Sequence, residues 1–413
     1  MGNRASIQLF QQSGGLIALM VVVFLVSCSP SLASSNSVHT PTASNSTPTI
    51  LSVDPAAAIV TSTITATTKV TATATATVIA PTAAPSTTPT NLPTLAPPPG
   101  FNTDTLYDNV LPVTYLEDTC MVYSQRWNVA NAAPGTVVVP VMFHGVTKRP
   151  PSAGDNISVS ADYFKASMKK ARDLGFETIT IQQLVDFLHH NAYIPPRSLL
   201  LIIDDRRLGT VKEHFLPILE EYDWHLTMAY ITGVINEQEW SQLKEVLETG
   251  RVEVQAHGFM HNGETYITKW TSEEIIRQEL FSPLQAFEEH AVQEPLAFIW
   301  PGGNFNQISV DLAQEAGYQV GFTVFARGPI MHNWIPLGEP EREMNNPLIV
   351  LPRYWSTTLY RNLDYAVEIG RSAQALAEAQ KFQEIDWFQA NCTGYPPMSF
   401  PLTPDETEVH DRW

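Results

Sequence analysis

Positive charge is scarce in this 413-residue sequence, which has 24 Lys and Arg residues against 42 Asp and Glu residues and a formal net charge of -18. Almost every acidic residue lies after position 100. This charge balance argues against binding nucleic acid or teichoic acids by charge attraction. It is compatible with neutral or amine-bearing glycans as partners, and we expect a monomer with no nucleic-acid partner.

Charge and a periodic apolar face are both nearly absent from residues 29–100, which consist mainly of Ser, Thr, Ala and Pro. A segment of this composition cannot bury enough apolar surface to form a packed core. We therefore expect an extended, disordered tether. The remaining residues, 101–413, are long enough for one large domain with a sizeable core.

The first 28 residues have the pattern of a secretory signal. Arg4 precedes an apolar run from residue 16 to residue 26, and Leu25-Val26-Ser27 comes directly before Cys28. This tripeptide and cysteine resemble a bacterial lipobox, which implies cleavage before Cys28 and acylation of its thiol. The alternative is an uncleaved anchor helix. Both interpretations place the rest of the chain outside the cytoplasm, and the first attaches it to the membrane through a lipid anchor.

Two of the three cysteines remain once Cys28 is assigned to lipidation. Cys120 and Cys392 lie near the two ends of the folded part, in an oxidising compartment. We expect a disulfide between them, which would join an N-terminal helical region to the C-terminal tail. The alternative is two unrelated buried thiols.

Short apolar segments alternate with segments of helical periodicity after residue 134, which predicts a parallel sheet with crossover helices. Seven or eight such units favour a closed or nearly closed barrel. An open doubly wound sheet would need a Gly-rich phosphate loop after its first strand, and the sequence has none there. The predicted strands are 136–143, 178–181, 198–203, 226–231, 252–256, 296–300, 320–325 and 348–351. The predicted helices are 160–175, 182–190, 212–222, 237–248, 272–290 and 310–316.

Polar residues follow several of these strands. Asp204 and Asp205 come after an apolar run, while His257 and His261 follow the strand 252–256. The carboxyl ends of the strands meet at one end of a barrel, so these side chains should converge. One Asp and two His would hold a zinc-like divalent ion with an open position, which leaves the second Asp free to act as a base. The alternatives are a solvated helix cap for the aspartates and a chance pair of histidines.

The order apolar-Asp204-Asp205, then His257-x-x-x-His261, then Phe298-x-x-Pro301-Gly302-Gly303 resembles the polysaccharide deacetylase family, carbohydrate esterase family 4. The resemblance extends over residues 136–355. It implies an α/β fold, an incomplete (β/α) barrel of the polysaccharide deacetylase type. It also implies that Asp204 is the catalytic base and that Asp205, His257 and His261 bind the metal.

The sequence departs from the family pattern at four positions. Arg206 replaces the usual Gly after the paired aspartates, and Gly258 replaces Ser or Thr after the first histidine. The segment 298–303 lacks the Arg that often orients the base, and the last motif has Arg353 and no general-acid His. We expect His144, at the end of a predicted strand, to be the general acid. The alternative is a core histidine.

The sequence therefore predicts a lipid-anchored, metal-dependent hydrolase that removes acetyl groups from N-acetylated polysaccharide at the cell envelope. The first alternative is a catalytically weak or inactive glycan-binding barrel, and the second is another amide hydrolase on a similar barrel. Aromatic rings in the later loops could stack on sugars, including Phe305, Trp334, Tyr354 and Trp355. The residues expected to contact substrate are Arg206, Trp300, Pro301, Gly302 and Arg353.

Overall fold

An eight-stranded sheet organises the part of the chain that the computed structural model describes, which is residues 96–262, 266–396 and 398. These residues belong to the compact unit Thr87–Trp413. Cys28, the predicted signal and nearly all of the predicted tether lie outside the described residues. In the described part of the chain, no helix is long and apolar enough to cross a membrane.

All neighbouring strands of this sheet are parallel, in the order β10-β9-β8-β7-β6-β2-β12, and β5 also pairs with β6. Every residue of β2 and β7 is buried, as expected for parallel strands covered on both faces by crossover helices. The strands of this sheet are β2 Val137–Phe143, β5 Glu177–Thr178, β6 Arg197–Ile203, β7 Leu226–Tyr230, β8 Val252–Ala256, β9 Ala297–Ile299, β10 Val320–Phe322 and β12 Tyr354–Trp355.

The two edges of the sheet nearly meet. An isolated parallel bridge joins Phe322 of β10 to Leu351, which lies just before β12 at the other edge. The amide of Leu351 donates to Gly321 O over 2.7 Å, and the amide of Thr323 donates to Leu351 O over 2.9 Å. The bridge is a single contact and not a full strand pair, so the predicted incomplete (β/α) barrel is confirmed.

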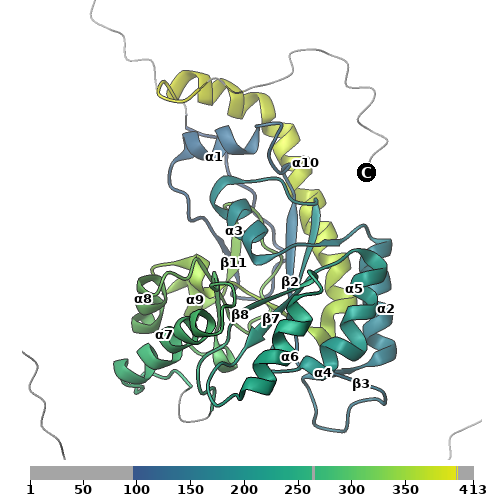
Figure 1. Ribbon diagram of the computed structural model, residues 1–413. Coiled ribbons are helices and arrows are strands. Elements are labelled where there is room, and N and C mark those ends of the chain that lie inside the picture. The colour runs from purple at the N-terminus through teal and green to yellow at the C-terminus, as the bar shows by residue number, and fades with distance from the viewer. Residues whose placement is uncertain (1–95, 263–265, 397, 399–413) are drawn as a thin grey trace, which may run out of the picture. The chain divides into compact units, whose positions relative to one another are not determined.

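Helices surround this sheet (Figure 1). Several of them begin with a side-chain cap: Ser160 accepts from the amide of Tyr163, and Thr180 and Asn236 each form a capping box. The helices are α1 Thr119–Arg126, α2 Ala161–Asp173, α3 Ile181–His190, α4 Leu208–Thr210, α5 Leu216–Tyr222, α6 Glu237–Leu247, α7 Glu273–Glu289, α8 Gln307–Glu315, α9 Glu339–Arg342 and α10 Leu359–Asn391. The π-helical turn Val211–Phe215 joins α4 to α5, and 3-10 turns span Pro301–Gly303, Pro347–Val350 and Ser356–Thr358.

Two short ladders lie outside the main sheet. Strand β1 (Leu111–Val113) pairs antiparallel with β11 (Ile335–Leu337). Strand β3 (Gly145–Thr147) pairs parallel with β4 (Ser158–Ser160).

The predicted final strand at 348–351 is wrong. Most of that segment is the 3-10 turn Pro347–Val350; Leu351 makes one bridge to β10, and the next strand of the chain is β12. The apolar residues there are buried by packing rather than by strand pairing, because a buried apolar run alone does not distinguish the two. The predicted strand 178–181 is also too long. The observed strand β5 ends at Thr178, and Ile181 already begins α3.

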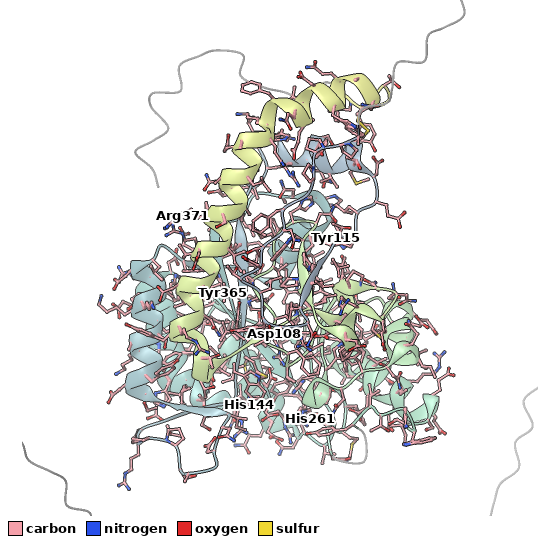
Figure 2. The ribbon with its side chains drawn as sticks, turned by 180° about the vertical axis from the view of Figure 1, so that it is seen from behind. Asp108, Tyr115, His144, His261, Tyr365 and Arg371 are labelled. Atoms are coloured by element: carbon pink, nitrogen blue, oxygen red, sulfur yellow. A yellow bond between two sulfur atoms is a disulfide. The ribbon has the colours of Figure 1, made fainter. Side chains whose placement is uncertain are left out.

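The expected disulfide is present and joins Cys120 in α1 to Cys392 at the end of α10. Helix α10 packs against β2 and α2 along its first part and against α1 farther on. Figure 2 shows α10 running from the end of the molecule that carries His144 and His261 to the opposite end. The crosslink therefore lies far from those two histidines.

Candidate active site

The carboxyl ends of three parallel strands, β2, β6 and β8, supply the polar side chains of the site. His144 follows β2, Asp204 and Asp205 follow β6, and His257 follows β8. The amide of Asp204 donates to Phe143 O over 2.7 Å, so the chain keeps its pairing up to the first carboxylate. Asp205 then adopts a left-handed conformation with φ of 67°, which turns the chain away from the sheet.

Asp205, His257 and His261 come together as a candidate metal-ligand set. One ligand atom from each residue lies within 4.8 Å of those of the other two. His257 Nε2 is 4.0 Å from Asp205 Oδ1, and the two imidazole rings are 4.4 Å apart between centroids. Ligand atoms around one tetrahedral zinc ion with bonds of about 2.0–2.2 Å lie about 3.4 Å apart, so these three side chains would need to draw slightly closer together around an ion.

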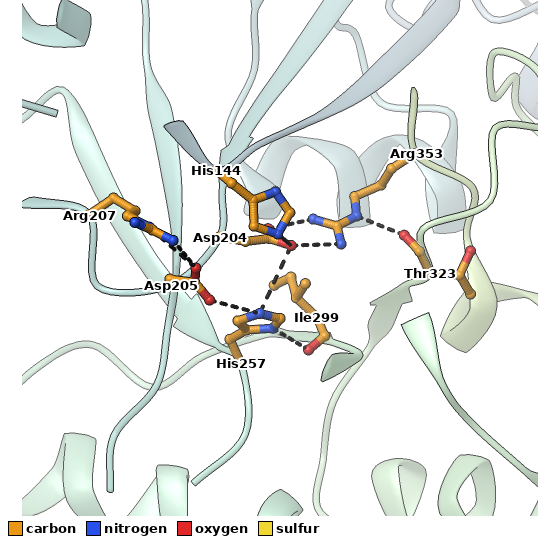
Figure 3. Close-up of polar contacts among 8 residues, drawn as sticks. All are labelled: His144, Asp204, Asp205, Arg207, His257, Ile299, Thr323 and Arg353. Carbon is orange, nitrogen blue, oxygen red and sulfur yellow. Dashed lines mark hydrogen bonds and ion pairs between the residues drawn. The ribbon is translucent and has the colours of Figure 1, made fainter. Parts of the chain in front are cut away.

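The orientation of His257 also suits a ligand. Its Nδ1 donates to Ile299 O over 2.8 Å, which leaves Nε2 as an acceptor directed at the two aspartates (Figure 3). The ring is 1% exposed, and burial lowers the pKa of His257 to about 4. The imidazole is therefore neutral near pH 7, which is the form that binds metal ions.

Asp204 is not shared with this set but is held by Arg353. The guanidinium donates to both carboxylate oxygens, Nη1 to Oδ1 over 2.6 Å and Nη2 to Oδ2 over 3.0 Å. Its Nε donates to Thr323 O over 2.8 Å, and Arg353 itself is fully buried. Burial, the largest single influence, raises the pKa of Asp204, but the charge and hydrogen bonds of Arg353 together with His257 and His144 lower it by more, so the net shift of the pKa is downward. Asp204 is therefore an ionised carboxylate at neutral pH.

Asp204 also faces two histidines through the oxygen that accepts from Arg353 Nη2. Its Oδ2 lies 3.9 Å from His257 Nε2 and 3.9 Å from His144 Nε2. The side chain of His144 is partly exposed, and its Nδ1 is buried without a hydrogen-bond partner in the described part of the chain. Burial lowers the pKa of His144, against the opposing charge of Asp204. His144 therefore lies where a proton could pass between it, a substrate and the carboxylate.

The side chains of Arg206 and Arg207, which follow the aspartates, point in different directions. Arg207 pairs with Asp205 Oδ2 through Nη2 at 2.8 Å and Nε at 3.2 Å, which leaves Oδ1 directed at His257. Arg206 turns the other way, and its Nη1 donates to Val234 O over 3.1 Å. The arginine that pairs with Asp205 is thus Arg207 and not Arg206.

Three of the residues expected to contact substrate are buried in this structure. Trp300 is fully buried and donates through Nε1 to Ile349 O over 2.7 Å, so neither ring face is open to a sugar. Pro301 is buried in the turn that follows β9. Arg353 is fully buried against Asp204. Gly302 and the partly exposed Arg206 are still accessible from solution.

The arginine that holds Asp204 could not be identified from the sequence. Residues 298–303 contain no arginine, and Arg353, near β12 at one edge of the sheet, takes this place in the structure. The available signal was the position of Arg353 directly after an apolar segment that closes the barrel. A buried carboxylate, Glu279 on α7, was missed as well, because one Glu among the many acidic residues of an amphipathic helix carries no distinguishing pattern.

Comparison with known proteins finds one matching family model and several similar proteins. Residues 193–321 match the family model described as Polysaccharide deacetylase. The protein YxkH of Bacillus subtilis (strain 168) is 23% identical over 186 residues, which cover 44% of this chain and 63% of that protein. The poly-beta-1,6-N-acetyl-D-glucosamine N-deacetylase of Staphylococcus aureus (strain MRSA252) is 27% identical over 186 residues, 41% of this chain and 62% of the relative.

The chain thus spans less than two thirds of the length of these curated relatives. Among solved structures, the Streptococcus pyogenes deacetylase PplD in complex with acetate aligns with a TM-score of 0.46 and 21% identity. That alignment covers 55% of this chain and 97% of the other.

Proposed function

We propose that this protein is a divalent-metal-dependent hydrolase that removes acetyl groups from N-acetylated polysaccharide. The observation that carries the proposal is the division of labour between neighbouring carboxylates. Asp205 belongs to a ligand set with two histidines, while Asp204 is held apart by Arg353. A site that only binds glycan has no need of an ionised, buried carboxylate directed at a metal position.

The ion would be held by Asp205, His257 and His261, and the donor set of two imidazoles and one carboxylate suits zinc. When bound, such an ion supplies a Lewis acid that lowers the pKa of water and polarises an acyl carbonyl. His257 contributes Nε2, because its Nδ1 is already bonded to Ile299 O. Asp205 contributes Oδ1, because Arg207 holds Oδ2.

The protein's own residues would move the protons. Asp204 accepts a proton from the attacking water as the water oxygen joins the acetyl carbon. That proton passes from Asp204 to His144, 3.9 Å away, and His144 donates it to the departing nitrogen as the carbon–nitrogen bond breaks. The products are acetate and a free amine, so the atoms of one water molecule are accounted for. Arg353 keeps Asp204 ionised and fixed in direction, which makes it ready to accept that proton.

The substrate class rests on the domain and on the composition of the chain. The match to the polysaccharide deacetylase model supports an acetylated glycan. The Staphylococcus aureus relative is named for a polymer of N-acetyl-D-glucosamine, which supports an N-acetylated amino sugar here. The acidic chain also favours a product that gains amino groups. Gly302 and Arg206 are the accessible residues that we propose to contact this substrate.

Acetate release from the full-length protein tests the proposal. Purified protein should release acetate from oligomers of N-acetylglucosamine, lose this activity after dialysis against a chelator, and regain it with zinc. The control is the same glycan with its amino groups left unacetylated. If no acetylated glycan in a panel of N- and O-acetylated polymers yields acetate in the presence of zinc, the proposed function is wrong.

We further propose that the protein acts at the cell envelope, attached to the membrane through acylated Cys28. The support is the sequence of residues 1–28 and the Ser, Thr, Ala and Pro composition that follows. A Cys28→Ala variant should move from the membrane fraction to the soluble fraction. If it stays in the membrane fraction, an uncleaved helix anchors the protein instead.

A further inference from the structure

The backbone between the two candidate ligands His257 and His261 makes hydrogen bonds through both its carbonyl groups and its amide groups. On one side it meets the turn that follows β7: the amide of Thr232 donates to Gly258 O over 3.3 Å, and the amide of Gly233 donates to Phe259 O over 2.7 Å. These bonds use the carbonyl groups of residues 258 and 259. The amide groups of the same turn must find acceptors elsewhere, because buried amides are seldom left unpaired.

Glu279 on α7 provides those acceptors. Its carboxylate accepts three successive amide N–H groups, from Phe259 over 3.0 Å, Met260 over 2.9 Å and His261 over 3.3 Å. Glu279 is 1% exposed, so water cannot take its place. The third of these amides belongs to His261 itself. Glu279 thus holds the backbone of one candidate ligand and of the two residues before it.

Gly258 lies directly against the carboxylate of Glu279. Its φ is 79°, a conformation that L side chains rarely adopt, and a Cβ atom there would lie 2.6 Å from Glu279 Oε2 and 3.1 Å from Pro301 Cγ. The carboxylate occupies the space that a side chain at 258 would need. This accounts for the glycine at the position where the family resemblance expects Ser or Thr.

We infer that Glu279 is a positioning residue that organises the His257–His261 turn for the divalent ion before the ion binds. A turn already held in the ligating conformation costs less ordering entropy on metal binding. Partners of metal ligands typically change metal affinity by about 10–100-fold when they are removed. The inference takes its catalytic meaning from the proposed function, but the metal affinity that it predicts does not depend on any activity.

Zinc affinity of the full chain, measured by competition with a chromophoric chelator, tests this role. Glu279→Gln should raise the Kd for zinc about 10–100-fold, because a neutral amide oxygen cannot accept all three N–H groups and its NH2 group opposes them. Glu288→Gln is the matched control, since Glu288 lies exposed on the same helix, and its Kd should equal that of the parent. Gly258→Ala should raise the Kd in the same direction by displacing the carboxylate.

Under saturating zinc, kcat of Glu279→Gln should return to near the parent value, because Asp204 and His144 are untouched. A defect in folding alone would not give this pattern of weak zinc binding with recoverable turnover. A folded Glu279→Gln protein that binds zinc as tightly as the parent would overturn the inference. The parent's failure to release acetate would refute the proposed function and leave this comparison of zinc affinities intact.

Hydrogen exchange of the unmodified protein tests the same point if the variants do not fold. Peptides that cover residues 258–261 should be protected from exchange without zinc, and zinc should add little further protection. If these amides exchange freely until zinc is added, the ion organises the turn and Glu279 does not.

Discussion

Asp204 forms a buried, bidentate ion pair with Arg353, which lies where the two edges of the sheet nearly meet. Asp204 ends β6 in the middle of the sheet, whereas Arg353 lies between Leu351, which bridges to β10, and β12 at the edge. The amide of Arg353 also donates to Phe325 O over 3.2 Å. Closing the barrel and orienting the proposed base are thus done by the same few residues.

Asp204→Asn should keep the metal and lose most turnover. The variant removes a proton acceptor but not a candidate ligand, and loss of a positioned base typically costs about 10²–10⁴-fold in rate. Zinc content measured by mass spectrometry should equal that of the parent, while acetate release falls. If Asp204→Asn releases acetate at the parental rate, Asp204 is not the base, and a glycan-binding barrel becomes the better account.

Arg353→Lys should lower kcat and move the acidic limb of the pH–rate profile to higher pH. Arg353 now lowers the pKa of Asp204 against burial, and a lysine cannot reproduce the two-pronged contact. With the weaker partner, burial raises the pKa of Asp204, so the base becomes protonated at a higher pH.

The stability of Arg353→Lys should also depend on pH in the direction that follows from the pKa of Asp204. A carboxyl whose pKa is lowered in the folded state stabilises the protein above its unfolded-state pKa, and this stabilisation is lost as the pH falls. Removing one member of a buried pair costs about 3–5 kcal/mol, and the retained charge of Lys should reduce that loss. Urea unfolding of Arg353→Lys and of the parent at several pH values measures this loss in the free energy of unfolding. An unchanged acidic limb would show that Arg353 does not tune Asp204.

Variants of the candidate metal ligands should behave differently from Asp204→Asn. Asp205→Asn should weaken zinc binding first, so that activity falls at low zinc and is partly restored by excess zinc. His257→Ala together with His261→Ala should remove the metal altogether. Titration of activity against free zinc separates these variants from Asp204→Asn, which added zinc should not rescue. Full metal stoichiometry in the double histidine variant would contradict the assignment.

Sequence patterns predicted the strands that carry the site because each ends an apolar run with a polar residue. Residues 252–256 were predicted as a strand and form β8 with the same limits. The paired aspartates and the two histidines could be placed together for the same reason, since parallel strands bring their carboxyl ends to one edge.

The remainder depended on contacts that local patterns do not encode. Strand β12 has two residues, too few to show a period, so Arg353 was assigned to substrate rather than to Asp204. Trp300 is an aromatic beside a Pro-Gly-Gly turn, which resembles a sugar-stacking position. Only the packed structure shows that its ring is covered and that its N–H group is bonded to Ile349 O.

Arg207 and Arg206 offer a matched pair of variants. Arg207 lies against Asp205, and its positive charge opposes a cation at the same carboxylate. Arg207→Gln should therefore tighten zinc binding a few-fold, more at low salt than at high salt. Arg206→Gln should leave zinc affinity unchanged, because that side chain turns toward Val234 and Glu239. Equal effects of the two substitutions on zinc affinity would refute this assignment.

The Cys120–Cys392 disulfide should stabilise the fold without affecting the chemistry. It closes a separation of 272 residues, and loss of a native disulfide typically costs about 2–5 kcal/mol. A Cys120→Ser, Cys392→Ser protein should unfold at lower urea concentration than the parent. Its kcat and zinc Kd should stay at parental values, because the crosslink and the candidate site lie at opposite ends of the described domain. A loss of zinc affinity in the folded double variant would show that α1 and α10 communicate with the strand ends.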